Sequence, residues 1–369
     1  MGPLAGVKVI EMAGLGPGPF AGMVLADLGA EVVHIGRPGA TFGEMGALER
    51  GKRSVGLDLK DPAALDVLLQ LVDGADVLID VYRPGVAERL GFGPEACAAR
   101  NPGLVYVRLT GYGQDGPWAQ KAGHDIDYLA LSGTLEPLGP ADGPPAPPIN
   151  VLADFAGGAT FAVVGALAAL HERATSGRGQ VVDAAMVDGA AMLLAPFFAG
   201  RAGGGWGPRG TNLLDGAAPF YGSYACADGA WLAVGALEPQ FYAALVEGLG
   251  LDEDPTAQYD QEGWPALRER MAAAVATRTR DEWVAVFADR DACVAPVLTP
   301  VEAVDHPHAV ARDAFRTPTP GRPEPNPAPR FDRTLAAVRD RAPDPAGVLA
   351  DFGLDPAAAA ALLAAGTVT

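Results

Sequence analysis

The chain has 369 residues and a formal net charge of −18, from 45 acidic and 27 basic side chains. This excess of acid argues against nucleic acid and anionic membranes as partners, because both bind basic surfaces. The length predicts two domains, and a hydrophobic content of 49% is enough for a buried core. The three cysteines lack the spacing of a disulfide framework or a metal site, and the first residues lack a secretory signal. We therefore expect a cytoplasmic protein without a bound metal.

The first 200 residues alternate between short apolar strands and helices, as in a doubly wound α/β fold with a parallel sheet. Pro62 after Asp61 marks one helix start, and a glycine-rich turn precedes another helix. The uncharged residues 155–170 are too few for a membrane span and predict a buried helix. We expect strands at residues 7–11, 31–35, 54–59, 77–82, 104–109 and 180–184, and helices at residues 20–28, 62–73 and 154–175 and after Pro94.

The pattern changes beyond residue 200. Residues 201–216 are glycine-rich and loop-like, and the turn Ala227-Asp228-Gly229 lies between two apolar runs that predict a β-hairpin. The proline-rich residues 317–329 predict a linker, and the alanine-rich end from Pro345 predicts helix. We expect a large α/β domain at residues 1–200, a smaller α+β domain with linkers at residues 201–316, and a return segment at residues 317–369 that packs on the large domain. Helices in the smaller domain are expected at residues 240–249, 264–277 and 281–288.

Cations gather in one segment of this acidic chain, at Arg50, Lys52, Arg53 and Lys60. Lys and Arg bind phosphates by charge and by hydrogen bonds. A site for a small polyanion is therefore one interpretation, and a solvated strand with scattered charges is the other.

The turn Gly14-Leu15-Gly16-Pro17-Gly18-Pro19 resembles a dinucleotide-binding turn, but Pro19 stands where the third glycine belongs. The following strand ends in His34-Ile35-Gly36-Arg37 and lacks the acidic residue that binds a ribose. Arg37 suits a phosphate on the ribose, which NADP and coenzyme A (CoA) both carry. Arg83 and Arg89 follow another strand end, where ligands bind in open α/β sheets.

Three positions are candidates for acid–base chemistry. His124 precedes Asp125 after a glycine-rich loop, so that an imidazole lies beside a carboxylate. Asp154 begins an apolar helix, where an aspartate is also expected simply as an N-cap. Glu238 lies between a predicted strand and a helix, where it is also explained as an acid of the first helical turn.

Seven short motifs lie in order along nearly the whole chain. They are Gly14-Leu15-Gly16-Pro17-Gly18-Pro19-Phe20, Arg50-Gly51-Lys52-Arg53-Ser54, Arg83-Pro84-Gly85-Val86, Gly111-Tyr112-Gly113-Gln114, Gly123-His124-Asp125-Ile126, Ala153-Asp154-Phe155-Ala156-Gly157-Gly158 and Gly235-Ala236-Leu237-Glu238-Pro239-Gln240-Phe241-Tyr242. Together they resemble the family III CoA transferases, and within these most closely the α-methylacyl-CoA racemases. Two positions depart from that pattern: Asp127 stands where similar racemases have Asn, and His34 where an arginine is usual.

The resemblance implies an isomerase of lipid and fatty acid metabolism that interconverts (2R)- and (2S)-2-methylacyl-CoA thioesters. It implies an acyl-CoA substrate, no separate cofactor because CoA is part of the substrate, and two chains interlocked as a homodimer. It implies that His124 and Asp154 are the paired acid and base, with Asp125 beside them and Glu238 in support. The residues implied in CoA binding are Arg37, Leu57, Asp58, Leu59, Lys60, Arg83, Arg89, Gly123 and Tyr128.

Three other functions stay open on the sequence. A family III CoA transferase would use Asp154 as a nucleophile toward the thioester, although it needs no second base such as His124. An NADP-dependent oxidoreductase would suit Arg37 but not the broken glycine motif. A non-catalytic acyl-CoA binder would need the cations alone.

Overall fold

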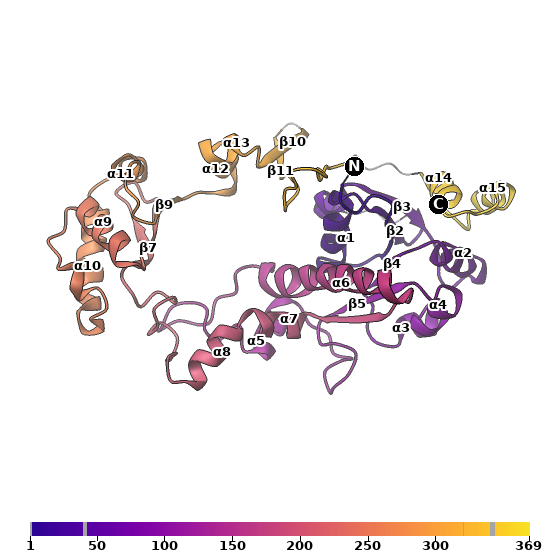
Figure 1. Ribbon diagram of the computed structural model, residues 1–369, viewed down its shortest axis with the longest axis horizontal. Coiled ribbons are helices and arrows are strands. Elements are labelled where there is room, and N and C mark those ends of the chain that lie inside the picture. The colour runs from indigo at the N-terminus through magenta and orange to yellow at the C-terminus, as the bar shows by residue number, and fades with distance from the viewer. Residues whose placement is uncertain (1, 40–42, 320, 340–343) are drawn as a thin grey trace. The chain divides into compact units, whose positions relative to one another are not determined.

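The computed structural model describes residues 2–39, 43–319, 321–339 and 344–369. Two compact units form, and their elements are labelled in Figure 1. The first unit consists of Met1–Thr134, Pro148–Ala195 and Phe315–Thr369, and the second of Leu135–Pro147 and Pro196–Ala314.

The first unit is built on a six-stranded parallel sheet with the strand order β3-β2-β1-β4-β5-β6. The central strands are apolar on both faces, and Ile10, Val33, Leu78 and Val107 are completely buried, as in sheets covered by helices on each side. A strand forms at each of the six predicted places, so the predicted parallel α/β fold is confirmed. The strands are β1 Lys8–Met12, β2 Glu31–Gly36, β3 Lys52–Gly56, β4 Val77–Asp80, β5 Val105–Thr110 and β6 Val181–Ala185.

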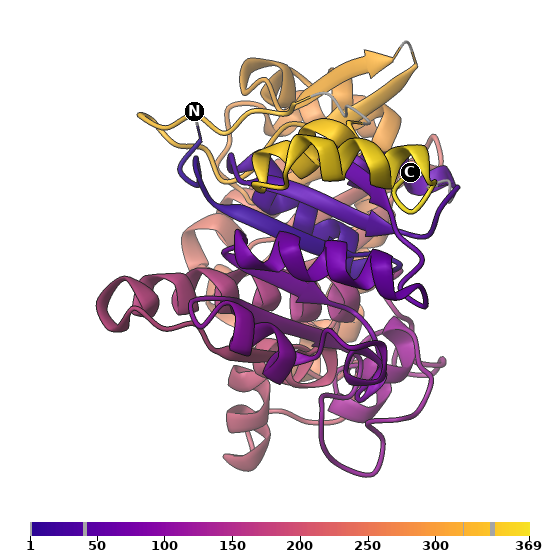
Figure 2. The same ribbon diagram turned by 90° about the vertical axis from the view of Figure 1, so that its right-hand side faces the viewer.

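Helices connect and cover these strands. The start of α2 follows the predicted chemistry, because the Asp61 carboxylate accepts a hydrogen bond from Ala63 N at 2.9 Å and Pro62 is the first helical residue. The C-terminal helices α14 and α15 run beside the sheet in Figure 2, and α14 packs on β3. The helices of this unit are α1 Pro17–Asp27, η1 Gly43–Glu49, α2 Pro62–Asp73, α3 Val86–Leu90, α4 Pro94–Arg100, α5 Asp125–Ser132, η2 Val151–Ala159, α6 Thr160–Ser176, α7 Met186–Leu193, α14 Pro345–Asp351 and α15 Pro356–Ala364.

The helix expected at residues 154–175 begins earlier than predicted. Its first part, η2, is a wide π-helical segment with Asn150 as the N-cap, so Asp154 lies inside the first turn rather than at the cap. The continuous helix Val151–Ser176 is long and apolar enough to cross a membrane by length and composition. In this fold α6 packs on β5, β6 and α1, as the core helix of an α/β unit does.

The second unit contains a three-stranded antiparallel sheet in the order β7-β8-β9. The predicted hairpin is present as β7 Tyr221–Ala225 and β8 Trp231–Gly235, whereas the third strand, β9 Val294–Val297, was not predicted. The apolar faces of its helices enclose Phe220, Leu245 and Met271. The helices of this unit are α8 Ala195–Ala202, α9 Pro239–Leu249, η3 Pro255–Ala257, η4 Gln261–Gly263, α10 Trp264–Val275, α11 Arg280–Phe287, α12 Pro300–Asp305 and α13 Pro307–Ala311.

The interpretation of residues 317–329 as a linker is wrong for their first part. A two-stranded hairpin, β10 Phe315–Thr319 and β11 Arg322–Pro325, forms there. Prolines are compatible with such an isolated pair, because each strand has an edge on which no amide is needed.

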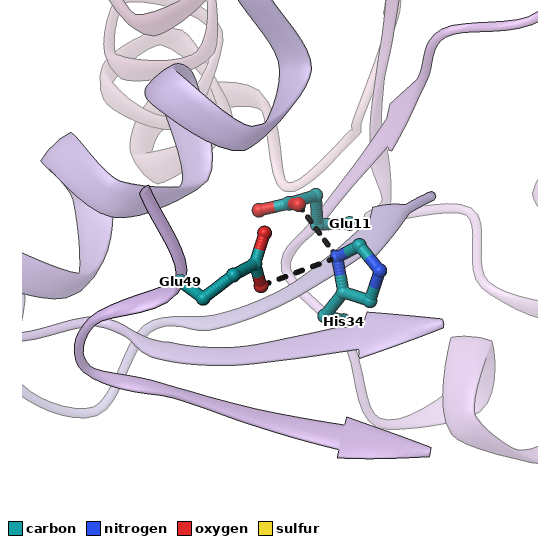
Figure 3. Close-up of side chains that lie close together, drawn as sticks. All are labelled: Glu11, His34 and Glu49. Carbon is teal, nitrogen blue, oxygen red and sulfur yellow. Dashed lines mark hydrogen bonds and ion pairs between the residues drawn. The ribbon is translucent and has the colours of Figure 1, made fainter. Parts of the chain in front are cut away.

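Four ionisable side chains form a buried ring among β1, β2, β3 and η1. Figure 3 shows three of them, Glu11, His34 and Glu49. His34 Nδ1 lies 2.8 Å from Glu11 Oε1 and 3.8 Å from Glu49 Oε2. The fourth, Lys52, places its ammonium 2.6 Å from Glu11 Oε2 and 3.8 Å from Glu49 Oε1. We call these four residues the buried charge ring.

The buried charge ring also fixes helix α1. Lys52 Nζ donates a hydrogen bond to Pro19 O at 2.9 Å, in the first turn of α1. Gly22 faces Glu11 so closely that a Cβ there would lie 1.7 Å from Glu11 Oε2. The buried charge ring therefore fixes the position of the first turn of α1, which follows the glycine-rich turn. An unpaired charge in this buried region would be costly.

We predict that Lys52→Met lowers the free energy of unfolding by about 3 to 5 kcal/mol, because it leaves two buried carboxylates with one partner fewer. Urea denaturation checks this. Arg53→Met is the matched control: Arg53 follows on the same strand but pairs with Glu31 and Asp351 near the surface, and we expect a loss below about 1 kcal/mol. Equal losses for the two variants would contradict the prediction.

Candidate active site

The strand order places the topological switch point of the sheet between β1 and β4, where ligands bind in open α/β folds. The glycine-rich turn follows β1, and the turn with Arg83 follows β4. The two turns touch, since a Cβ at Gly14 or Gly18 would lie 2.6 or 2.5 Å from Val81 side-chain carbons. The glycines are thus needed to bring the two turns together.

Asp80 shapes the turn that carries Arg83. Its carboxylate accepts hydrogen bonds from Tyr82 N at 2.9 Å and from the Tyr106 hydroxyl at 3.0 Å. Burial raises the pKa of Asp80 to about 6, against the lowering effect of these hydrogen bonds and of the Arg108 charge. Asp80 is therefore a structural carboxyl group at the carboxyl end of β4.

Asp125 connects helix α5 to the π-helical segment η2. One oxygen of its buried carboxylate, Oδ2, accepts hydrogen bonds from Ala153 N at 2.7 Å and from Asp154 N at 2.8 Å. Because Asp125 follows His124 directly, this bond joins the two segments that carry the predicted acid–base pair.

Asp154 is half-buried, and its carboxylate lies among polar and charged neighbours. Burial raises its pKa, the nearby Asp125 charge raises it further, and the hydrogen bond from Asn150 and the charge of His124 lower it. The Asn150 amide donates to Asp154 Oδ2 at 3.2 Å. A Cβ on Gly16 would lie 3.4 Å from the same oxygen, which places the glycine-rich turn beside Asp154. The structure therefore brings His124, Asp125 and Asp154 together.

The contact between Asn150 and Asp154 was not predicted. A spacing of four residues could have indicated it, because side chains four apart on a helix are neighbours.

His124 is the exposed N-cap residue of α5. Its backbone N–H donates to Asp127 Oδ2 at 2.9 Å. An asparagine oxygen could accept the same bond, so the Asp127 departure leaves this helix start intact.

Tyr128 lies in the first turns of α5, and its ring packs against two glycines. Its hydroxyl donates to Gly123 O at 2.5 Å, and a Cβ at Gly111 or Gly123 would lie 2.2 or 2.7 Å from its ring. Burial and, to a smaller extent, the nearby Asp154 charge raise the pKa of Tyr128 to about 12, against the lowering effect of Arg83. Gly123 and Tyr128 thus belong to the neighbourhood of Asp154 and Arg83.

The predicted CoA-binding cations lie at the carboxyl ends of the strands. Arg37, Lys60, Arg83 and Arg89 are exposed, and none forms an ion pair with a carboxylate in the part of the chain that is described. Arg37 lowers the raised pKa of Tyr82, so the turns after β2 and β4 are neighbours. After β3, Leu57 is part of the hydrophobic core and Leu59 packs against it, while the Asp58 carboxylate accepts a bond from Lys60 N at 3.1 Å.

The interpretation of residues 50–60 as one phosphate-binding cluster is wrong for three of its four cations. Lys52 is part of the buried charge ring, and Arg53 pairs with Glu31 and Asp351. Arg50 forms a buried ion pair with Asp27 and donates to Pro325 O. Only Lys60 of the four is exposed.

His34, which stands where the family pattern usually has an arginine, is buried with Glu11 and Glu49. These three side chains lie close enough to hold a metal ion. The Lys52 ammonium already supplies the positive charge between the two carboxylates. The residues therefore fit a lysine better than a metal.

Glu238 belongs to the second unit. It is the exposed N-cap residue of α9, and its side chain makes no capping hydrogen bond. Glu238 precedes the first turn of α9 instead of lying in it, so the interpretation as an acid of the first helical turn is wrong by one position.

Known proteins are similar to this chain over most of its length. The profile of CoA-transferase family III matches residues 4–347. The chain belongs to CoA-transferase family III. Mouse α-methylacyl-CoA racemase is 50% identical over 335 residues, which are 90% of this chain and 87% of the relative; the human enzyme is 47% identical over the same shares.

More distant members of family III include transferases. Succinyl-CoA–D-citramalate CoA-transferase of Chloroflexus aurantiacus is 33% identical over 85% of this chain and 83% of the relative. The solved CAIB/BAIF family protein of Brucella suis superposes with a TM-score of 0.82 at 26% identity, covering 99% of both chains.

We predict that Asp80→Asn becomes more stable relative to the unmodified protein as the pH rises from about 4 to 7. The Asp80 carboxyl group has a higher pKa in the folded than in the unfolded state, so it binds a proton more tightly when the protein is folded. The unmodified protein therefore loses this stabilisation as the pH rises through this window, and the asparagine variant does not. The relative gain should be roughly 1 to 3 kcal/mol and constant above pH 7.

Urea denaturation at several pH values measures this change. Asp66→Asn, at an exposed position of α2, is the control for general effects of charge. A difference between Asp80→Asn and the unmodified protein that does not vary with pH would show that Asp80 ionises normally.

Proposed function

We propose that this protein is a racemase of the α-methylacyl-CoA type, which interconverts (2R)- and (2S)-2-methylacyl-CoA thioesters. The observation that carries the proposal is the pair of hydrogen bonds from the Ala153 and Asp154 amides to Asp125, which connect Asp154 to the residue directly after His124. The 50% identity to a named racemase supports it.

The reaction removes the proton from C2 and returns a proton to the opposite face. One group, as a base, accepts the C2 proton and leaves an enolate of the thioester; the other, as an acid, donates a proton to C2. Asp154 and His124 exchange these roles for the two epimers. Burial raises the pKa of Asp154 and so brings it closer to that of an imidazole, which makes proton transfer feasible in both directions.

The enolate oxygen requires hydrogen-bond donors. The Ala153 and Asp154 amides cannot serve, because both already donate to Asp125. The first amides of α5, at Asp125 and Ile126, have no acceptor within the helix, since helical bonding begins later. We therefore assign the stabilisation of the enolate to the start of α5, beside His124.

The CoA part of the substrate would lie along the carboxyl ends of β2, β3 and β4. We propose that its phosphates contact Arg37, Lys60, Arg83 and Arg89, whose charges have no carboxylate partner among the described residues. Leu57, Asp58 and Leu59 shape the turn that carries Lys60, and Gly123 and Tyr128 border the path toward Asp154. No cofactor other than the CoA of the substrate is part of this proposal.

A family III CoA transferase is the alternative, because relatives with that name share this fold family. In that reaction the Asp154 carboxylate would attack the thioester carbonyl and form an anhydride, with CoA as the leaving group. His124 has no role in that step, whereas a racemase requires it.

We also propose a homodimer in which Glu238 of one chain completes the site of the other. Several large apolar side chains of the first unit are exposed, with Val164 at 55%, Val181 at 50% and Met192 at 63%. Such a group of exposed apolar residues suits a protein interface. Glu238, exposed and without a capping bond, suits a role outside its own helix.

We predict that either epimer of a 2-methylacyl-CoA, incubated in deuterated water, yields the same epimer mixture with deuterium at C2. His124→Ala and Asp154→Asn should each lower exchange by roughly 100-fold or more, while CoA binding persists. His171→Ala, an exposed histidine of α6, is the control. Acyl transfer to succinate without exchange at C2 would favour the transferase.

We predict that the inactive variants His124→Ala and Glu238→Ala complement each other when co-expressed with different tags. In a hybrid dimer one site would carry both changes and the other would be intact, so the isolated hybrid should have about half of normal activity. The pair His124→Ala and Asp154→Asn is the control, because each site then keeps one lesion. A hybrid as inactive as both parents would show that each site is built within one chain.

A further inference from the structure

The loop between β5 and α5 contains a lysine that the proposed mechanism does not use. Lys121 Nζ lies 3.6 Å from the centroid of the Trp118 ring, and Lys121 N donates to Trp118 O at 2.8 Å. A cation over an aromatic face is attracted to it but keeps its charge. The Lys121 ammonium is therefore held in place and still exposed to solvent.

The Trp118 ring is connected to the candidate active site by further aromatic contacts. It packs edge-on against Tyr112, with centroids 5.4 Å apart, and Tyr112 packs edge-on against Tyr128 at 5.0 Å. Tyr128 lies in the electrostatic neighbourhood of Arg83 and Asp154. Successive contacts of these three rings therefore connect Lys121 to Tyr128.

The same loop is bound to the turn after β4. The Gln120 amide donates to Pro84 O at 3.0 Å. Arg89 also returns to this turn, since its backbone N bonds to Gly85 O at 3.2 Å and a Cβ on Gly85 would lie 3.4 Å from Arg89 Nη1. Lys121, the residue after Gln120, therefore belongs to a loop that is hydrogen-bonded to the turn carrying Arg83.

In a chain with a net charge of −18, Lys121 differs from two other lysines in its surroundings. Lys52 is buried between two glutamates, and Lys8 Nζ donates to Asp351 O at 2.6 Å while lying over Phe352. Across the described residues, Lys121 has an aromatic partner but no carboxylate. A cation without a carboxylate partner, on a loop bonded to the turn that carries Arg83, suits an anionic ligand.

We propose that Lys121, supported by Trp118, binds the diphosphate of the CoA thioester together with Arg83 and Arg89. The inference rests on the proposed function, since it assumes a CoA ligand. It adds a binding residue that is separate from the acid–base pair, so Lys121 should affect substrate affinity and not the proton-transfer step.

The test compares the affinity of Lys121→Gln and of the unmodified protein for CoA, 3′-dephospho-CoA and pantetheine by calorimetry at low salt. We expect Lys121→Gln to weaken CoA and 3′-dephospho-CoA binding about 3- to 10-fold and to leave pantetheine binding unchanged. Lys121→Arg should restore most of the affinity. Lys8→Gln, which removes the other lysine that lies over an aromatic ring, should have no effect.

Kinetics with a 2-methylacyl-CoA should show a higher KM at unchanged kcat for Lys121→Gln, with the difference decreasing as salt is added. Equal CoA affinity of the variant and the unmodified protein would overturn the inference, as would an equal loss for pantetheine. A loss that disappears with 3′-dephospho-CoA would overturn the assignment to the diphosphate. If the unmodified protein binds no CoA, the proposed function itself fails.

Discussion

The candidate site depends on one buried carboxylate, that of Asp125. It follows His124 in the chain and accepts hydrogen bonds from the Ala153 and Asp154 amides, so a single side chain connects both residues of the proposed acid–base pair. Hydrogen bonds to a charged group contribute about 1.5 to 3 kcal/mol each, enough to hold the wide first turn of η2 in one arrangement. The same bonds occupy the Ala153 and Asp154 amides, which is why the proposed contact with the enolate is assigned to the start of α5.

The buried charge ring fixes the helix that follows the glycine-rich turn. Lys52 bonds to Pro19 O, and Gly22 leaves space for Glu11 under α1. A ring of this kind need not be more stabilising than a hydrophobic core, because burying four ionisable groups is costly. It does require one arrangement of β1, β2, β3 and α1, since any other would leave a charge unpaired. The position of Gly16 beside Asp154 follows from that arrangement.

The sequence predicted those features that depend on local pattern. Apolar runs gave the six strands, and the Asp61-Pro62 pair gave the start of α2, because both effects act within a few residues. The partners of Lys52 and Arg53 could not be predicted, since Glu11, Glu31 and Asp351 approach them only through sheet pairing and the docking of α14. Likewise, strand β9 pairs with β8 across about 60 residues, and its short sequence has no period of its own.

The acid–base pair can be compared with a nucleophilic carboxylate on physical grounds. A nucleophile must be ionised, and burial together with the Asp125 charge opposes ionisation of Asp154. A general acid–base group benefits from the same raised pKa, because proton transfer is most efficient when donor and acceptor are matched. Burial raises the pKa of Asp154, and the charge of His124 acts in the opposite direction on that carboxyl group. The proposed racemisation requires a proton acceptor and a proton donor on opposite faces of C2, whereas an acyl transfer at Asp154 would give His124 no role.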